Sequence, residues 1–271
     1  MRYGVCNWIF GDEDLATTAA YLARTGFDGI ELKGDLELYQ IAAVNEILDD
    51  HGLAVLSLTP EDVDLAHPDA RVRQRAVDYY LRLLDFAAAI GAPVVSCHGA
   101  VGRIRALADH AEEYDHLVAS VRIVAQRAAG ANLLLAMEVL NRYESHLLNT
   151  AAQATDFVSD VAASNVGILL DTYHMNIEEA NPCMAILDAW ERLLLFHVAD
   201  SNRRAIGRGH TDFLALMRAL QRIDYAGDII VECTAAGPDP FTPVKDGDWR
   251  GQVRRYAAES LRFLKAREPV N

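Results

Sequence analysis

Four side chains that can bind a cation each come directly after an apolar run in the second half of the chain. They are Glu138 after LLLAM, Asp171 after GILL, His197 after LLLF and Glu232 after DIIV. A carboxylate buried behind an apolar run is costly unless an opposite charge pairs with it, and carboxylates brought together repel one another. A divalent cation removes both costs, so these residues together predict a metal site.

The predicted ligand set is rich in oxygen, which suits Mn²⁺ first, with Mg²⁺ or Co²⁺ as alternatives, whereas structural zinc favours thiolates. Taken alone, each residue has a simpler explanation, because a strand-end carboxylate can cap the next helix and a lone histidine can be a core residue. Four such residues after four successive runs favour the metal. The cysteines show no CxxC spacing, and we expect them to be free thiols: Cys6, Cys97, Cys183 and Cys233.

Two of the predicted ligands could also move a proton. A C–H beside a ketone is a weak acid and a glutamate is a weak base, and a cation at the carbonyl oxygen narrows that gap. A carboxylate has two oxygens, so Glu138 and Glu232 could each hold the cation with one and exchange a proton with the other. Inverting a carbon by proton transfer requires such groups on both faces of a planar intermediate, so in such a reaction we expect these two on opposite sides of the bound ligand.

The elements that must position these side chains repeat along the chain. Short runs rich in Val, Ile and Leu begin at positions 3, 27, 54, 93, 133, 166, 193 and 227, on average 32 residues apart. The segments between them have helical spacing; within 69–92, for example, Ala76, Tyr80 and Leu83 share one face. Glycines fall shortly before four of the expected strands, where a positive φ would end the preceding helix: Gly26, Gly52, Gly91 and Gly227.

This repeat predicts an α/β fold, a closed (β/α)8 TIM barrel that forms a single domain over residues 1–271. Nearly continuous apolar strands need cover on both faces, and eight β-α units of this length match the barrel. An open doubly wound sheet is the alternative, but the first turn, GVCNWIFGDED, lacks the glycine fingerprint for a dinucleotide. In such barrels the carboxyl ends of the strands form one mouth, where the four ligands would meet.

Composition narrows the class of partner. The chain has 271 residues, 51% of them hydrophobic, and a formal net charge of −14 without a basic stripe, so nucleic acid is not an expected partner. No apolar run approaches the ~20 residues that cross a bilayer, so no membrane partner is expected. The start MRYGVCNWIFGDEDL has acidic residues too early for a secretory segment, so we expect a cytoplasmic protein. With nucleic acid and membrane not expected, the remaining partner is a small-molecule substrate.

Two longer motifs carry a family resemblance. The segments EVLNRYESHLLNTAAQATDFVSDV and DTYHMNIEE resemble the ketose 3-epimerases that act on D-tagatose and D-psicose, within the xylose isomerase-like sugar phosphate isomerase/epimerase superfamily. The resemblance is densest from residue 133 to about 235. It implies that Glu138, Asp171, His197 and Glu232 hold the metal, with Glu138 and Glu232 also serving as acid and base. It further implies a homodimer or a homotetramer built as a dimer of dimers.

The same resemblance implies that Glu144, His174 and Arg203 hold the first hydroxyls and the carbonyl of a sugar. Residues near other strand ends are open to two interpretations. His98, after the fourth run, could contact substrate or metal or belong to the core, and Trp8 could wall a sugar face or pack internally. Glu31, after the second run, could face the mouth or pair with Lys33 or an arginine.

Three departures from the family pattern keep other activities open. Ile206 stands where proline is expected, Asp200 and Ser201 stand where many epimerases resemble G-E-N, and residues 233–243 replace an aromatic-rich segment. A metal-dependent aldose-ketose isomerase, similar to hydroxypyruvate isomerase, or a lyase acting on a keto-sugar, such as an inosose dehydratase or a C-glycoside-cleaving enzyme, begins with the same deprotonation. A DNA-repair endonuclease of this barrel type is disfavoured by the acidic charge, and an inactive sugar-binding subunit by the complete ligand set.

Overall fold

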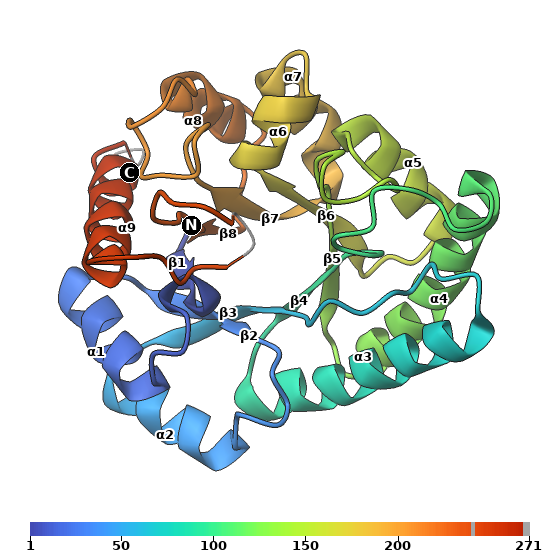
Figure 1. The fold of residues 1–271 in the computed structure, drawn as a ribbon, viewed down its shortest axis with the longest axis horizontal. Helices are drawn as coiled ribbons and strands as arrows, with labels where there is room; N and C mark the ends of the chain where they lie inside the picture. The colour runs from blue at the N-terminus through green and yellow to red at the C-terminus, as the bar shows by residue number, and fades with distance from the viewer. Residues whose placement is uncertain (240–241, 268–271) are drawn as a thin grey trace.

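The computed structural model describes residues 1–239 and 242–267, and within them eight parallel strands close into a barrel in chain order. Helices surround the barrel on the outside (Figure 1). The predicted TIM barrel is therefore confirmed, and each apolar run contains a strand. The strands are β1 Tyr3–Cys6, β2 Gly29–Lys33, β3 Ala54–Thr59, β4 Val94–Cys97, β5 Leu134–Glu138, β6 Val166–Asp171, β7 Leu193–Val198 and β8 Asp228–Val231.

The helices form where the sequence has helical spacing and side-chain caps. Asp69 and Asp109 cap the two longest helices, and Thr150 forms a capping box with Gln153 at the start of α5. The helices are α1 Leu15–Thr25, α2 Ile41–Asp50, α3 Ala70–Ile90, α4 His110–Gly130, α5 Ala151–Val161, α6 Thr172–Glu178, α7 Pro182–Ala189, α8 Phe213–Arg222 and α9 Trp249–Lys265, with 3-10 turns η1 Asn7–Phe10 and η2 Trp190–Arg192.

Three of the four glycines expected at helix ends have the positive φ that was predicted. Gly26 and Gly91 end α1 and α3 with φ of 92° and 74°, and Gly52 has φ of 64°. The prediction is wrong for Gly227, because Asp224 makes the left-handed turn there, with φ of 50°. Gly227 lacks room for a side chain instead, since a Cβ would lie 2.4 Å from Tyr225 Oη.

Two register shifts set which residues face each other at the mouth. One lies in β2 between Ile30 and Glu31, and it brings Glu31 opposite Ser57 of β3. The other lies in β6 between residues 168 and 169, and it brings Asp171 opposite His197 of β7. A one-residue change of register reverses which face a side chain occupies, so these irregularities decide which groups meet.

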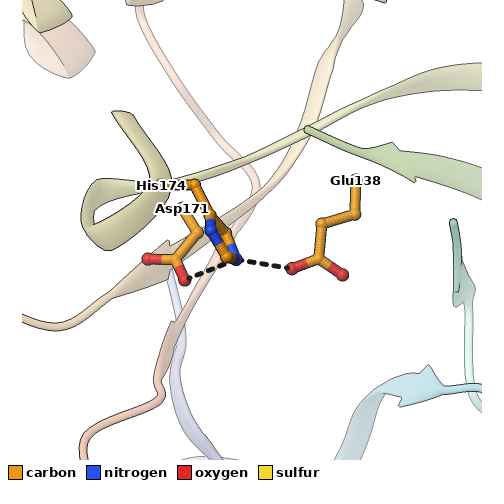
Figure 2. Close-up of side chains that lie close together, drawn as sticks. All are labelled: Glu138, Asp171 and His174. Atoms are coloured by element: carbon orange, nitrogen blue, oxygen red, sulfur yellow. Dashed lines mark ion pairs between the residues drawn. The ribbon is translucent and has the colours of Figure 1, made fainter. Parts of the chain in front are cut away.

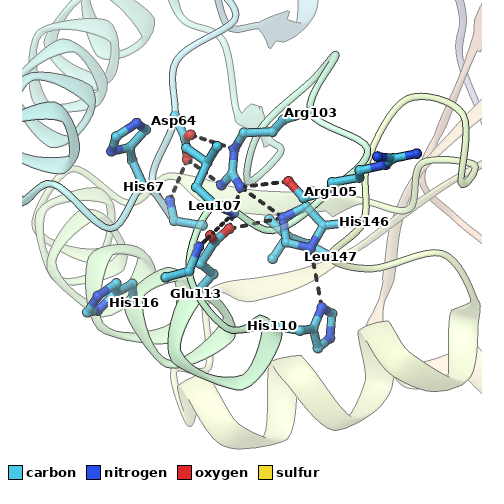
Figure 3. A network of polar contacts seen from close by, with 12 residues as sticks. Asp64, His67, Arg103, Arg105, Leu107, His110, Glu113, His116, His146 and Leu147 are labelled. Atoms are coloured by element: carbon cyan, nitrogen blue, oxygen red, sulfur yellow. Dashed lines mark hydrogen bonds and ion pairs between the residues drawn. The ribbon is translucent and has the colours of Figure 1, made fainter.

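A polar cluster joins the loops that follow β3, β4 and β5 (Figure 3). Arg103 donates from Nε to Asp64 Oδ2 at 2.9 Å and pairs with the buried Glu113 of α4. His146 Nε2 lies 3.0 Å from Glu113 Oε2, and the His146 backbone donates to the Arg103 carbonyl at 3.2 Å. The cluster therefore fixes the loop after β5, which carries part of the candidate site.

The pH dependence of stability should report on this cluster. Burial opposes ionisation of Glu113, but backbone N–H groups of Ala108 and Leu107 and the Arg103 guanidinium outweigh it and lower its pKa from 4.5 to about 2. The ionised group therefore stabilises the fold above pH 4.5, and that contribution is lost as the pH falls toward about 2. In urea unfolding, Glu113→Gln should be less stable at neutral pH and lose less stability over this acid range. The exposed Glu46→Gln is the control, and parallel losses in wild type and Glu113→Gln would contradict the assignment.

A glycine beside the second register shift should also matter. A Cβ on Gly167 would lie 2.4 Å from the Arg192 carbonyl oxygen and 2.5 Å from Leu194 Cγ, so Gly167→Ala should push β7 away from β6. We expect a loss of about 1–3 kcal/mol in the free energy of unfolding, measured by urea denaturation. Gly130→Ala, with nothing within 4 Å of the added Cβ, is the matched control. Equal stabilities of the two variants would show that the strand spacing at Gly167 tolerates a methyl group.

Candidate metal centre

The four predicted ligands stand at the carboxyl ends of consecutive strands. Glu138 and Asp171 are the last residues of β5 and β6, His197 lies in β7, and Glu232 directly follows β8. All four side chains are buried, and Asp171 is fully shielded from solvent. The closed barrel turns the ends of these strands toward one axis, so residues separated by 94 positions in the chain can share one site.

Two clusters of donor atoms overlap at this mouth. Glu138, His197 and Glu232 offer donor atoms that all lie within 4.8 Å of one another, and so do Glu138, Asp171 and His174. Figure 2 shows the second cluster, with the His174 ring between the two carboxylates. Among the described residues, neither cluster contains all four predicted ligands. The hydrogen bonds of the two histidines decide which of them can hold a cation.

His174 is bound as a hydrogen-bond donor toward the site. Its Nδ1 accepts the Asn141 backbone N–H at 3.2 Å and lies 2.7 Å from Asn141 Nδ2, so the proton of the neutral ring is on Nε2. Burial, followed by the charge of Arg203, lowers the pKa of His174 to about 3 and keeps the ring neutral. Nε2 lies 3.7 Å from Asp171 Oδ2 and 3.9 Å from Glu138 Oε1. A protonated nitrogen cannot ligate a metal, but it can donate to a substrate oxygen.

His197 presents the opposite arrangement. Its Nε2 faces Glu31. Its Nδ1 is buried and lies 3.5 Å from Glu232 Oε2. Within residues 1–239 and 242–267 this Nδ1 makes no hydrogen bond. Asp171 Oδ2 and Glu232 Oε2 are likewise buried without a hydrogen bond in that part of the chain. Three of the four predicted ligands thus each have a buried atom with an unused lone pair. A divalent cation could be coordinated by these three atoms.

The pKa values of the carboxylates show the unfavourable burial of charge that a bound cation would relieve. Burial and then the charge of Glu232 raise the pKa of Asp171 to about 7, and burial raises the pKa of Glu138 well above its usual value. For Glu232 burial acts in the same direction, but the charges of Arg203 and His197 outweigh it and lower the pKa. Carboxylates are therefore crowded together at a cost, and a bound dication would favour their ionised forms.

Arg203 lies beside the carboxylates, on the loop after β7. Its guanidinium is 3.2 Å from Glu232 Oε2 and 3.9 Å from Glu144 Oε1, and it stacks over the rings of Trp8 and Tyr173 at 5.6 and 4.7 Å from their centroids. Its backbone adopts a positive φ of 59°, which is uncommon for a side chain of this size. The predicted sugar contacts Arg203, Glu144 and Trp8 are thus brought together. Tyr173 was not predicted, although it stands between Asp171 and His174 in the chain.

Trp8 takes a more specific position than the apolar wall or core packing expected from the sequence. Its indole Nε1 donates to Glu232 Oε1 at 2.9 Å. This bond occupies one oxygen of Glu232 and leaves Oε2 for other partners. Glu144 is fixed in turn by Asn141, whose Nδ2 donates to Glu144 Oε1 at 2.9 Å.

His98 directly follows β4, and Glu31 is the middle residue of β2. His98 is buried, its Nδ1 makes no hydrogen bond in the described part of the chain, and its Nε2 lies 3.9 Å from Asp62 Oδ1. Because Cys97 pairs with Met137, His98 follows β4 at the level of Glu138. Glu31 contacts Ser57, Thr59 and His197, so the expected pairing with Lys33 or an arginine is not what holds it.

Two of the departures from the family pattern have local reasons. The Ile206 backbone N–H donates to Ser260 Oγ at 3.1 Å, a bond that proline could not make. Asp200 accepts backbone N–H groups of Ser201, Gly207 and Thr211 at 2.7, 2.8 and 3.2 Å, and so shapes the loop that carries Arg203. Of the third departure, residues 233–243, positions 240–241 lie outside the described residues.

The end of the motif DTYHMNIEE fastens this site to the loop after β5. Glu178 accepts the Arg142 backbone N–H at 2.7 Å and pairs with its guanidinium, and Glu179 accepts the first N–H of α5, from Ala151, at 2.7 Å. This loop carries Asn141 and Glu144. The motif therefore supplies both the ligand-bearing strand end and the anchors of the neighbouring loop.

The chain is similar to known proteins in sequence and in fold. Residues 19–267 match the xylose isomerase-like TIM barrel family. An L-ribulose 3-epimerase from Mesorhizobium japonicum is 32% identical over 239 residues, covering 85% of this chain and 80% of that protein. A 3-dehydro-D-guloside 4-epimerase from Escherichia coli is 29% identical and covers 91% of this chain and 97% of that protein. The structure of a D-psicose 3-epimerase with D-tagatose from Clostridium cellulolyticum H10 superposes with a TM-score of 0.89 at 26% identity, covering 98% and 99% of the two chains.

The resemblance to the ketose 3-epimerases is thereby confirmed. Within the described residues, none of the helices is both long and apolar enough to span a bilayer.

The two histidines should respond differently to substitution. His197→Gln removes a ligand nitrogen and should weaken Mn²⁺ binding by at least about 100-fold, whereas His174→Gln removes only a donor to substrate and should leave it within about 10-fold of wild type. Isothermal titration of the chelator-treated proteins with Mn²⁺ measures both affinities. Loss of binding in His174→Gln with retention in His197→Gln would assign the cation to the other cluster.

Proposed function

Because the chain belongs to the xylose isomerase-like TIM barrel family, we propose that it is a divalent-metal-dependent epimerase that inverts C3 of a ketose by proton transfer. The observation that carries the proposal is the cluster of Glu138, His197 and Glu232, whose donor atoms lie within 4.8 Å of one another at the barrel mouth. The names of the relatives, an L-ribulose 3-epimerase among them, support the same substrate class.

In this proposal Glu138, Asp171, His197 and Glu232 hold the cation. The bound cation supplies electrophilic stabilisation of the negative charge that develops on the carbonyl oxygen. Glu232 would hold the cation through Oε2, and its other oxygen, Oε1, which accepts the Trp8 indole N–H, keeps a lone pair that takes the proton from C3. Glu138 returns a proton to the opposite face. Strands β6 and β7 separate the strands of these two residues, which lets them flank a planar intermediate.

Other residues would hold the sugar in place. His174 donates from Nε2 to a sugar oxygen, since its Nδ1 is occupied by Asn141. Arg203 donates to the carbonyl end of the sugar. Glu144 lies near Nη1 of the Arg203 guanidinium, whereas Glu232 lies near Nη2, and Glu144 accepts a terminal hydroxyl of the sugar. Trp8, which lies beside the Arg203 guanidinium, and His98, whose Nδ1 makes no hydrogen bond in the described residues, would be further substrate contacts. This fixed arrangement contributes to rate by orienting the reacting C–H between its acid and base.

We propose Mn²⁺ as the cation, since hard oxygen ligands outnumber the single imidazole. We also propose that residues 1–271 form one domain, that the protein acts in the cytoplasm, and that it assembles as a homodimer or as a dimer of dimers. The closed barrel of eight strands supports the single domain, and the resemblance to the ketose 3-epimerases in residues 133 to about 235 supports the assembly.

A second activity is favoured by one comparison. The match to this chain extends over 97% of the length of the 3-dehydro-D-guloside 4-epimerase. For the L-ribulose 3-epimerase it extends over 80% of that protein's length. Inversion at C4 beside a C3 ketone uses the same deprotonation as inversion at C3 beside a C2 ketone. The aldose-ketose isomerase and the keto-sugar lyase also begin with this step, and they differ in where the proton returns or which group leaves.

Solvent deuterium tests the proposed chemistry. We expect wild type with Mn²⁺ to place deuterium at C3 of D-psicose or L-ribulose, detected by NMR together with the epimeric product. Glu232→Gln should reduce this exchange by about 10²–10⁴-fold, because the amide cannot accept the proton. The exposed Glu46→Gln should exchange like wild type. Full exchange in Glu232→Gln would remove that residue from the mechanism, and exchange only at C4 of 3-keto-glycosides would establish the second activity.

A further inference from the structure

Glu31 is a fully buried carboxylate that none of the proposed chemical steps uses. It is in β2, and it is 0% exposed. Three groups from two other strands surround it: Ser57 Oγ at 2.5 Å and Thr59 Oγ1 at 2.6 Å from β3, and His197 Nε2 at 3.1 Å from β7. A buried carboxylate with this many partners is held in one orientation, and one of its partners is a predicted metal ligand.

These contacts fix the tautomer of His197. The hydroxyls of Ser57 and Thr59 each donate to one oxygen of Glu31. An ionised carboxylate only accepts hydrogen bonds, so the ring nitrogen at 3.1 Å is the donor, and in the neutral form of the ring, which a bound cation requires, the proton is on Nε2. The lone pair is then on Nδ1, the buried atom without a hydrogen bond in the described residues that lies 3.5 Å from Glu232 Oε2.

The backbone is shaped to make this contact. Without the register shift after Ile30, Glu31 would face residue 56 of β3, but the shift places it opposite Ser57, and Thr59 follows on the same face of the strand. The second shift sets His197 opposite Asp171. Both irregularities of the barrel thus serve one line of contacts that runs from β3 through Glu31 and His197 to the predicted metal ligands.

We propose that Glu31 is a positioning residue, which orients the His197 ring and keeps its proton on Nε2 so that Nδ1 can bind the cation. The negative charge behind the ring also makes Nδ1 a stronger ligand. Ser57 and Thr59 hold Glu31 in the orientation that this requires. The inference rests on the metal site of the proposed function, but it concerns binding of the ion and not the fate of the sugar.

The test is the affinity of the full, chelator-treated chain for Mn²⁺, measured by isothermal titration without any sugar. Glu31→Gln has nearly the same shape but one acceptor oxygen in place of two, so either His197 or a hydroxyl must face an NH₂ group. We expect Mn²⁺ binding to weaken by about 10–100-fold. Thr59→Val, which removes one hydroxyl, should weaken it less.

Glu113→Gln is the matched control, because Glu113 is another buried, ion-paired glutamate whose partners are Arg103 and His146 and not the predicted ligands. It should lower the free energy of unfolding and leave Mn²⁺ affinity unchanged. A merely structural role of Glu31 predicts the same pattern for Glu31→Gln, so wild-type Mn²⁺ affinity in that variant overturns the proposal. If Glu31→Gln does not fold, Thr59→Val decides, and unchanged affinity there overturns the proposal as well.

Nitrogen-15 NMR of His197 in the Mg²⁺-loaded chain gives a second readout. Wild type should show a protonated Nε2 and an unprotonated Nδ1 at stoichiometric Mg²⁺, and Glu31→Gln should need a higher Mg²⁺ concentration to reach the same signals. A wild-type protein that binds Mn²⁺ but leaves ketoses unchanged would contradict the proposed function while supporting this inference. A wild-type protein that takes up no Mn²⁺ would overturn both.

Discussion

Electrostatic repulsion among buried carboxylates is the constraint on which the site depends. The barrel brings Glu138, Asp171 and Glu232 to one end, and burial together with mutual repulsion raises the pKa of the first two. Arg203 and His197 balance only part of this charge, chiefly at Glu232. A fold that keeps such a cluster gains from a bound dication, which turns an unfavourable group of charges into a set of ligands.

The surrounding structure can be understood as support for that cluster. The two register shifts align Asp171 with His197 and Glu31 with Ser57, which regular strands would not do. Asn141 holds His174 with its donor nitrogen toward the site, and Glu178 and Glu179 hold the loop that carries Asn141. His197, His174 and Glu144 therefore each have their orientation set by a second polar group, as precise catalysis of proton transfer requires.

Much of this could be predicted from the sequence, because strand ends in a TIM barrel share one mouth and apolar runs mark the strands. The positions of Glu138, Asp171, His197 and Glu232 followed from that rule. The rule could not tell which histidine has a free lone pair, since Asn141 and Glu31 determine this from 33 and 166 residues away. It also could not reveal the Trp8 bond to Glu232, or that Asp224 rather than Gly227 makes the turn before β8. These features depend on contacts between distant segments, which a local pattern does not encode.

The most direct test of this account is the titration of the chelator-stripped wild-type chain with Mn²⁺, followed by the thermal unfolding midpoint. The account predicts saturable uptake of a cation at the mouth and a rise of the midpoint with Mn²⁺ concentration, and Asp171→Asn should reduce both. A chain that neither binds a divalent cation nor gains stability from one, and that still epimerises a ketose in excess chelator, would contradict it.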